Sequence, residues 1–114
     1  MKYEPVKYFS DDEVERILRE GTYEECCILP ISVGEYSGDW KYAQDVCLKL
    51  MERKEDKIKA NAILGLSYIA RNHGFLEKEK ILPYIERELR NNKKFYYEIK
   101  YAVEDINLFM NWNL

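Results

Sequence analysis

The sequence predicts an all-α protein built as a short array of about three antiparallel helix pairs, six helices in all. Apolar residues recur at intervals of three and four along most of the chain, which is the spacing of one helix face. No segment shows sustained alternation of apolar and polar residues, so no sheet is expected. The length of 114 residues suits one ordinary domain, and we expect a single helical domain over residues 1–114.

The start of each early helix is indicated by a capping box. Ser10 is followed three residues later by Glu13, and Gly21 ends the first helix. Thr22 and Glu25 repeat the same device, so the second helix begins almost at once. This helix is expected to turn four residues inward, namely Tyr23, Cys26, Cys27 and Leu29.

Pro30 is expected to interrupt the second helix, and two glycines follow it in the sequence. Proline lacks the amide proton of the helical ladder and clashes with the preceding turn, so the helix should kink or end at Pro30. The segment VGEYSGD, which holds Gly34 and Gly38, is therefore predicted to be a turn.

Four further helices follow from the apolar spacing. They are expected at about residues 39–53, with Asp39 as N-cap, at about residues 56–72, around Pro83, and at about residues 95–110. The helix at 56–72 is apolar nearly all round and should be the most buried. The last helix is expected to direct one stripe to the core, consisting of Ile99, Ala102, Val103, Ile106, Phe109 and Met110.

Two segments of the chain repeat. IKANA begins at residue 58 and IKYAV at residue 99, 41 residues apart, within the roughly 40 to 47 of paired-helix solenoids. This pattern resembles the second helix of a HEAT repeat, and ILPYIERELRNN resembles the first helix, in which a proline bends the chain. The resemblance covers residues 39–110 and implies a short HEAT-like array with a kink at Pro83 in an outer helix.

Charge and cysteine content limit the class of protein. Residues 1–40 carry ten acids and four bases, net −6, whereas residues 41–114 carry 14 bases and 11 acids, net +3. The negative end attracts a basic partner, unless the acids serve only to start helices and line a solvated face. Cys26, Cys27 and Cys47 cannot all pair, and we expect reduced core residues. No membrane span or signal peptide is recognisable, so we expect a cytoplasmic protein.

No common catalytic or metal-binding motif occurs in the sequence. Phosphate loops, zinc motifs and nucleophile elbows are all missing, so we expect no enzyme, no cofactor and no metal. His73, which precedes Gly74 at a helix end, is expected to cap a carbonyl group. An enzyme related to helical-repeat DNA glycosylases is disfavoured by the short chain.

Aromatic residues beside acids indicate a protein-binding surface. The segment GEYSGDWKY interleaves aromatic and acidic side chains, and rigid rings supply desolvated contact area while acids steer a basic partner. Trp40 is either an anchor or a core residue. The predicted partner-binding set is Asp11, Asp12, Glu15, Glu35, Tyr36, Asp39, Trp40 and Tyr42. Nucleic-acid binding is a weaker alternative based on a small basic patch of Lys93, Lys94, Lys100, Tyr96 and Tyr97.

A small, acidic, tyrosine-rich helical chain of this kind resembles the compact HEAT-like immunity proteins of bacterial contact-dependent growth inhibition and other polymorphic toxin systems. The resemblance implies that the protein binds and neutralises one cognate toxin domain, often a nuclease, in the cytosol. It implies no membrane association and no small-molecule substrate. The alternative is a HEAT-like adaptor or scaffold that binds a peptide or protein partner.

Overall fold

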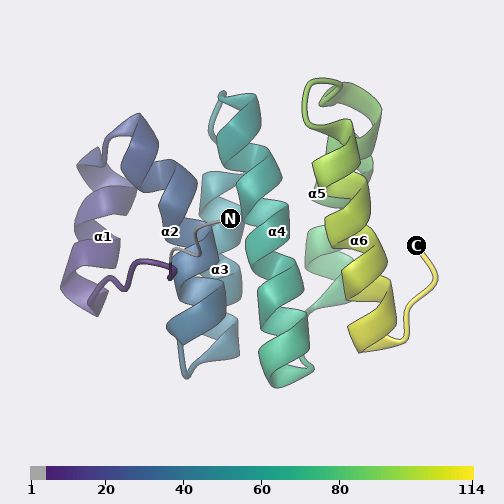
Figure 1. Cartoon of the computed structure of the whole chain (residues 1–114), viewed down its shortest axis with the longest axis horizontal. Coiled ribbons are helices and arrows are strands. Elements are labelled where there is room, and N and C mark those ends of the chain that lie inside the picture. Colours follow the sequence, from purple (N-terminus) through teal and green to yellow (C-terminus); the bar gives the residue numbers. More distant parts are fainter. Residues whose placement is uncertain (1–4) are drawn as a thin grey trace.

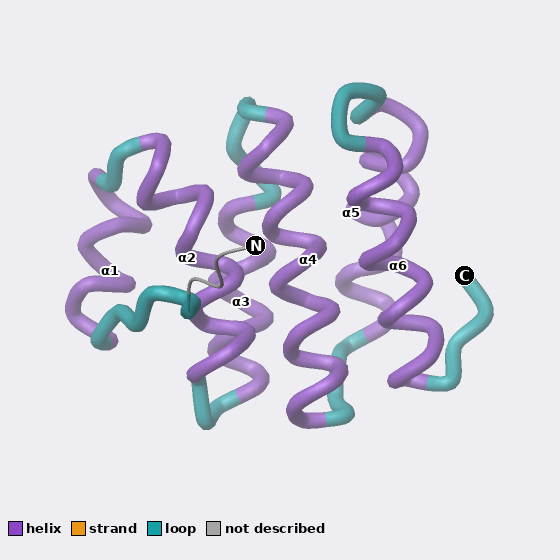
Figure 2. Tube along the Cα trace, viewed as in Figure 1, coloured by secondary structure: helices purple, strands orange, loops and turns teal. Residues whose placement is uncertain are grey.

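Six α-helices and no strand make up residues 5–114, the part of the chain that the structure, a computed structural model, describes (Figures 1 and 2). The prediction of an all-α chain with six helices is confirmed. The helices are α1 (Asp11–Glu20), α2 (Tyr23–Tyr36), α3 (Trp40–Leu50), α4 (Asp56–His73), α5 (Lys78–Asn91) and α6 (Tyr96–Met110). None of them is long and apolar enough to cross a membrane.

The helices form two layers. In Figure 1, α2, α4 and α6 lie side by side, and α3 and α5 lie behind them. Helix α4 is central because it contacts α2, α3, α5 and α6, while α1 packs against α2 and α3 at one end. As predicted, α4 contributes many buried residues, and its largest are Ile58, Ile63, Leu66 and Ile69.

Of the two outcomes expected at Pro30, a kink or an end of the helix, the end is wrong, because α2 continues through Pro30 to Tyr36 and includes Gly34. The prediction that VGEYSGD is wholly a turn is therefore wrong. Pro30 has no amide proton, so the carbonyl of Cys26, four residues earlier, lacks its helical donor. One residue on, Asn61 on α4 donates a hydrogen bond to the Cys27 carbonyl at 2.8 Å. Helix α2 thus persists where the local signal allows it to end.

Two glycines allow α2 and α4 to pack backbone against backbone. A Cβ added to Gly34 would lie 2.6 Å from the Gly65 carbonyl oxygen, and one added to Gly65 would lie 2.4 Å from the Pro30 carbonyl oxygen. No real Cβ makes contacts this short. Gly34 therefore lies inside α2 and permits close packing against α4. Of the two glycines in VGEYSGD, only Gly38 lies between helices.

Other burial predictions have mixed outcomes. All three cysteines are buried free thiols, as predicted, and burial raises the pKa of the Cys47 thiol. Tyr23 and Phe109 are exposed, contrary to prediction, because they lie in the first turn of α2 and the last turn of α6, where fewer neighbours cover a side chain. Helix α5 is continuous across the exposed Pro83, and the bend predicted there stays a prediction.

Candidate partner-binding site

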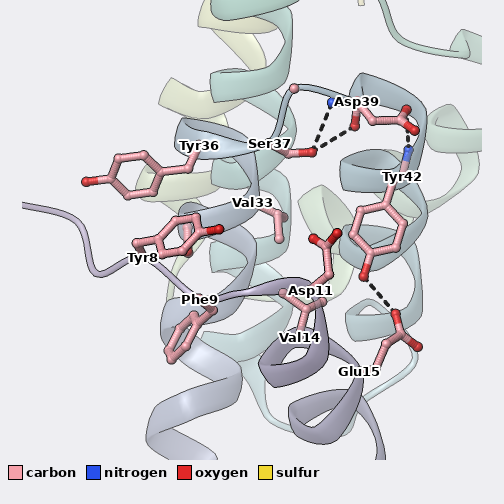
Figure 3. A pocket seen from close by; sticks show the side chains of 12 residues that line it. Tyr8, Phe9, Asp11, Val14, Glu15, Val33, Tyr36, Ser37, Asp39 and Tyr42 are labelled. Carbon is pink, nitrogen blue, oxygen red and sulfur yellow. Dashed lines mark hydrogen bonds between the residues drawn. The ribbon is translucent and has the colours of Figure 1, made fainter.

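A pocket of about 620 Å³ lies between the N-terminal segment, α1, α2 and the start of α3 (Figure 3). Twelve residues line this N-terminal pocket: Tyr8, Phe9, Asp11, Val14, Glu15, Ser32, Val33, Tyr36, Ser37, Gly38, Asp39 and Tyr42. Five of them belong to the predicted partner-binding set, namely Asp11, Glu15, Tyr36, Asp39 and Tyr42. The fold therefore brings together acids and tyrosines that are up to 31 positions apart in the sequence.

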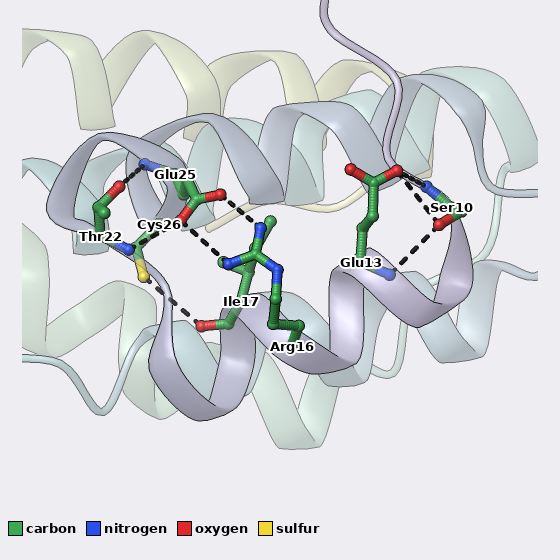
Figure 4. Close-up of polar contacts among 7 residues, drawn as sticks. All are labelled: Ser10, Glu13, Arg16, Ile17, Thr22, Glu25 and Cys26. Atoms are coloured by element: carbon green, nitrogen blue, oxygen red, sulfur yellow. Dashed lines mark hydrogen bonds and ion pairs between the residues drawn. The ribbon is translucent and has the colours of Figure 1, made fainter.

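Helix capping fixes the acids of the pocket. Ser10 caps α1 in a capping box with Glu13, which places Asp11 in the first turn and Glu15 one turn later on the same side of the helix (Figure 4). Asp39 caps α3, because its Oδ1 accepts hydrogen bonds from the backbone amides of Lys41 at 3.0 Å and Tyr42 at 3.1 Å. The Asp39 carboxylate is thus fixed at the start of α3, and Asp11 and Glu15 lie on the first two turns of α1.

Tyr42 connects α3 to α1 across the pocket. Its hydroxyl donates to Glu15 Oε2 at 2.7 Å (Figure 3). Burial and this hydrogen bond to a carboxylate both raise the pKa of the Tyr42 phenol, so it stays neutral at physiological pH. The bond fixes the Glu15 carboxylate and leaves its charge in the pocket.

Tyr36 and Tyr8 form the opposite rim. The Tyr36 hydroxyl donates to the Val6 carbonyl at 2.6 Å, and the two rings meet edge to face with centroids 5.7 Å apart. Tyr36 is 44% exposed and Tyr8 is 61% exposed. Sequence reasoning missed Tyr8, because the extended N-terminal segment has no periodic pattern that would place it on α2. Its only signal was the high tyrosine content of ten residues.

Among the described residues, no basic side chain lines the N-terminal pocket. Asp11, Glu15 and Asp39 all line it, and none of the lining residues within 5–114 is a lysine or an arginine. Within residues 5–114, no ion pair involves any of the three carboxylates. Because a concave site concentrates the field of the charges that line it, this pocket presents a strong negative potential to a partner.

The other three predicted residues lie outside the pocket. Asp12 is exposed on α1, and Glu35 forms an ion pair with Arg71 on α4 at 3.4 Å. Trp40 is half-buried against the core and stacks on Phe75 with ring centroids 5.6 Å apart, so of its two predicted roles the structure favours the packing residue.

The small basic patch lies elsewhere, on and before α6. Tyr96 and Tyr97 are exposed, and their ring centroids lie 5.3 Å apart. Lys93, Lys94 and Lys100, which are near them in the sequence, are also exposed. His73 Nε2 lies 2.9 Å from the Ser37 carbonyl oxygen, so the carbonyl group that it contacts follows α2 and does not belong to α4, the helix that His73 ends. Among the described residues, no group of three histidine, cysteine or acidic side chains could hold a metal ion.

No family model matches this sequence, and no curated protein matches it. Among solved structures, the fold is similar to a chain in the crystal structure of a CDI complex from Cupriavidus taiwanensis LMG 19424. The TM-score is 0.79, and the similarity covers 96% of this chain and 97% of that chain at 18% sequence identity. The two chains therefore share a fold along nearly their whole lengths.

Proposed function

We propose that this protein is an immunity protein that binds and neutralises a toxin domain of a contact-dependent growth inhibition system. The observation that carries the proposal is the nearly complete fold similarity to a chain of a CDI complex. Contact-dependent inhibition pairs a toxin with an immunity protein, and a helical array with an acidic pocket suits the second role. The paired helices then act as a HEAT-like scaffold in the cytosol.

The N-terminal pocket is the proposed toxin-binding surface. Nuclease domains carry basic surfaces because they bind phosphate groups, so an acidic pocket is complementary to them. Asp11, Asp12 and Glu15 would attract such a domain over distances of about 8 Å at physiological salt. Tyr8 and Tyr36 on the rim would supply the apolar area that holds the complex together.

Neutralisation is tested by co-expression in bacteria. A candidate toxin domain, taken from a gene adjacent to that of this protein, is produced from an inducible promoter, with or without the protein. Growth is expected to stop when the toxin is produced alone and to continue when the protein is present. A toxin domain from an unrelated system serves as the control and should remain toxic. Growth arrest by the neighbouring toxin despite abundant folded protein would refute the immunity function.

A further inference from the structure

The N-terminal pocket combines features that together suit one kind of ligand. Three carboxylates, from Asp11, Glu15 and Asp39, share it with the rings of Tyr8 and Tyr36. A volume of about 620 Å³ lies in the range of small-ligand sites and exceeds what one long side chain needs.

A hydroxyl in the wall is also available to a ligand. Ser32 is only 2% exposed and lines the pocket, and its hydroxyl makes no side-chain hydrogen bond to residues 5–114. Every fully enclosed polar side-chain atom in those residues has a partner, so the Ser32 hydroxyl opens onto the pocket. A ligand that fills the pocket can form a hydrogen bond with this hydroxyl. This observation is independent of the acidic charge.

We propose that the N-terminal pocket receives an arginine side chain of the protein partner. The proposal rests on the proposed function and specifies the chemistry of its binding site. The guanidinium would lie between the carboxylates of α1 and the Asp39 side chain, and its plane would stack against a rim tyrosine.

Arginine fits these walls better than lysine. Its planar guanidinium has five donors, which match several carboxylate and hydroxyl acceptors at once, and it stacks on aromatic rings. A lysine ammonium is a more strongly hydrated point charge and loses more hydration free energy when it enters a pocket. The acceptors of this pocket lie on three separate elements, α1, α2 and the start of α3, which favours the ligand with the wider set of donors.

The direct test is a titration of the protein with N-acetyl-arginine-methylamide, followed by NMR chemical shifts. The matched control is the citrulline analogue, which has nearly the same shape but no charge. We expect shift changes at backbone amides around the pocket and saturable binding in the millimolar range, as a single side chain allows. The citrulline analogue should bind at least about tenfold more weakly.

Isosteric variants locate the site. Glu15→Gln keeps an acceptor for the Tyr42 hydroxyl, and Asp39→Asn keeps a good N-cap, so both should fold. Each is expected to weaken arginine binding about fivefold to tenfold through loss of a charge-assisted hydrogen bond. Asp105→Asn removes the same charge from α6, outside the pocket, and should leave binding within about twofold.

Equal affinity for the arginine and citrulline analogues would overturn the proposal. So would an Asp105→Asn effect as large as that of the pocket variants, because the interaction would then be non-specific attraction to acidic charge. These results are distinguishable from failure of the proposed function. If the toxin domain binds but the arginine analogue does not, only the arginine pocket is refuted. If the arginine analogue binds and the toxin domain does not, the immunity function is refuted.

Discussion

At the scale of single residues, Gly65 controls how closely α2 and α4 pack. Its Cα lies so near α2 that an added Cβ would meet the Pro30 carbonyl oxygen at 2.4 Å and the Cys47 sulfur at 2.9 Å. The first neighbour is backbone and cannot rotate away. The sequence does not distinguish this glycine from one that ends a helix or permits a turn, because the close contact involves residues 35 positions apart.

Gly65→Ala is predicted to lower the free energy of unfolding by about 1 to 3 kcal/mol, because the inserted methyl group must push the two helices apart. Urea denaturation measures this change. Gly38→Ala is the matched control, since a Cβ added there would have no atom within 4 Å, and it should change stability by less than about 0.5 kcal/mol. Equal stability of both variants would mean that α2 and α4 have room for the methyl group.

Tyr36 supports a second prediction at this scale. If its ring is a buried anchor in the complex, Tyr36→Ala should accelerate dissociation of the toxin domain about 30-fold, equivalent to about 2 kcal/mol. Tyr36→Phe keeps the ring and loses only the hydrogen bond to the Val6 carbonyl, so its effect should be much smaller. Surface plasmon resonance measures both dissociation rates. Unchanged dissociation of the alanine variant would remove Tyr36 from the interface.

At the scale of elements, each helix of the α1–α2 pair begins with a capping box, and one ion pair connects the two helices (Figure 4). Arg16 on α1 reaches Glu25 in the first turn of α2 at 2.6 Å. Both capping boxes could be predicted from the sequence, because Ser or Thr followed three residues later by Glu is a local signal. The ion pair could not, because it depends on how two helices fold back on each other.

Acid unfolding tests this element. The hydrogen bonds from the Arg16 guanidinium and the Thr22 backbone amide lower the pKa of Glu25 from 4.5 to about 2. A lowered folded-state pKa stabilises the protein above pH 4.5, and this contribution is lost as the pH falls toward 2. Glu25→Gln is therefore predicted to reduce the pH dependence of the unfolding free energy in that window. Glu24→Gln removes a neighbouring charge that lacks this ion pair and is the control; an identical pH dependence for both variants would contradict the assignment.

At the scale of the whole molecule, local signals predicted the number and order of helices but not the pocket. The helix count followed from apolar periodicity and caps, which depend on neighbouring residues. The continuation of α2 into the predicted turn was missed, because the close packing at Gly34 and Gly65 involves residues far apart in the sequence. The contact of Val6 with Tyr36 joins residues 30 positions apart, and that of Glu15 with Tyr42 joins residues 27 apart. Asp11 and Asp39 nevertheless both line the pocket, because acids favour helix starts and the starts of α1 and α3 both border it.

The most direct test of the central claim is the association rate with the purified toxin domain at several salt concentrations. We predict that charge reversal at Asp11, Asp12 and Glu15 slows association and flattens its salt dependence, because these acids act by long-range steering. Reversal of Glu104 and Asp105 on α6 changes charge far from the pocket and should have little effect. Slower association after the α6 reversals, with unchanged rates for the α1 reversals in folded protein, would contradict the claim and move the interface to α6.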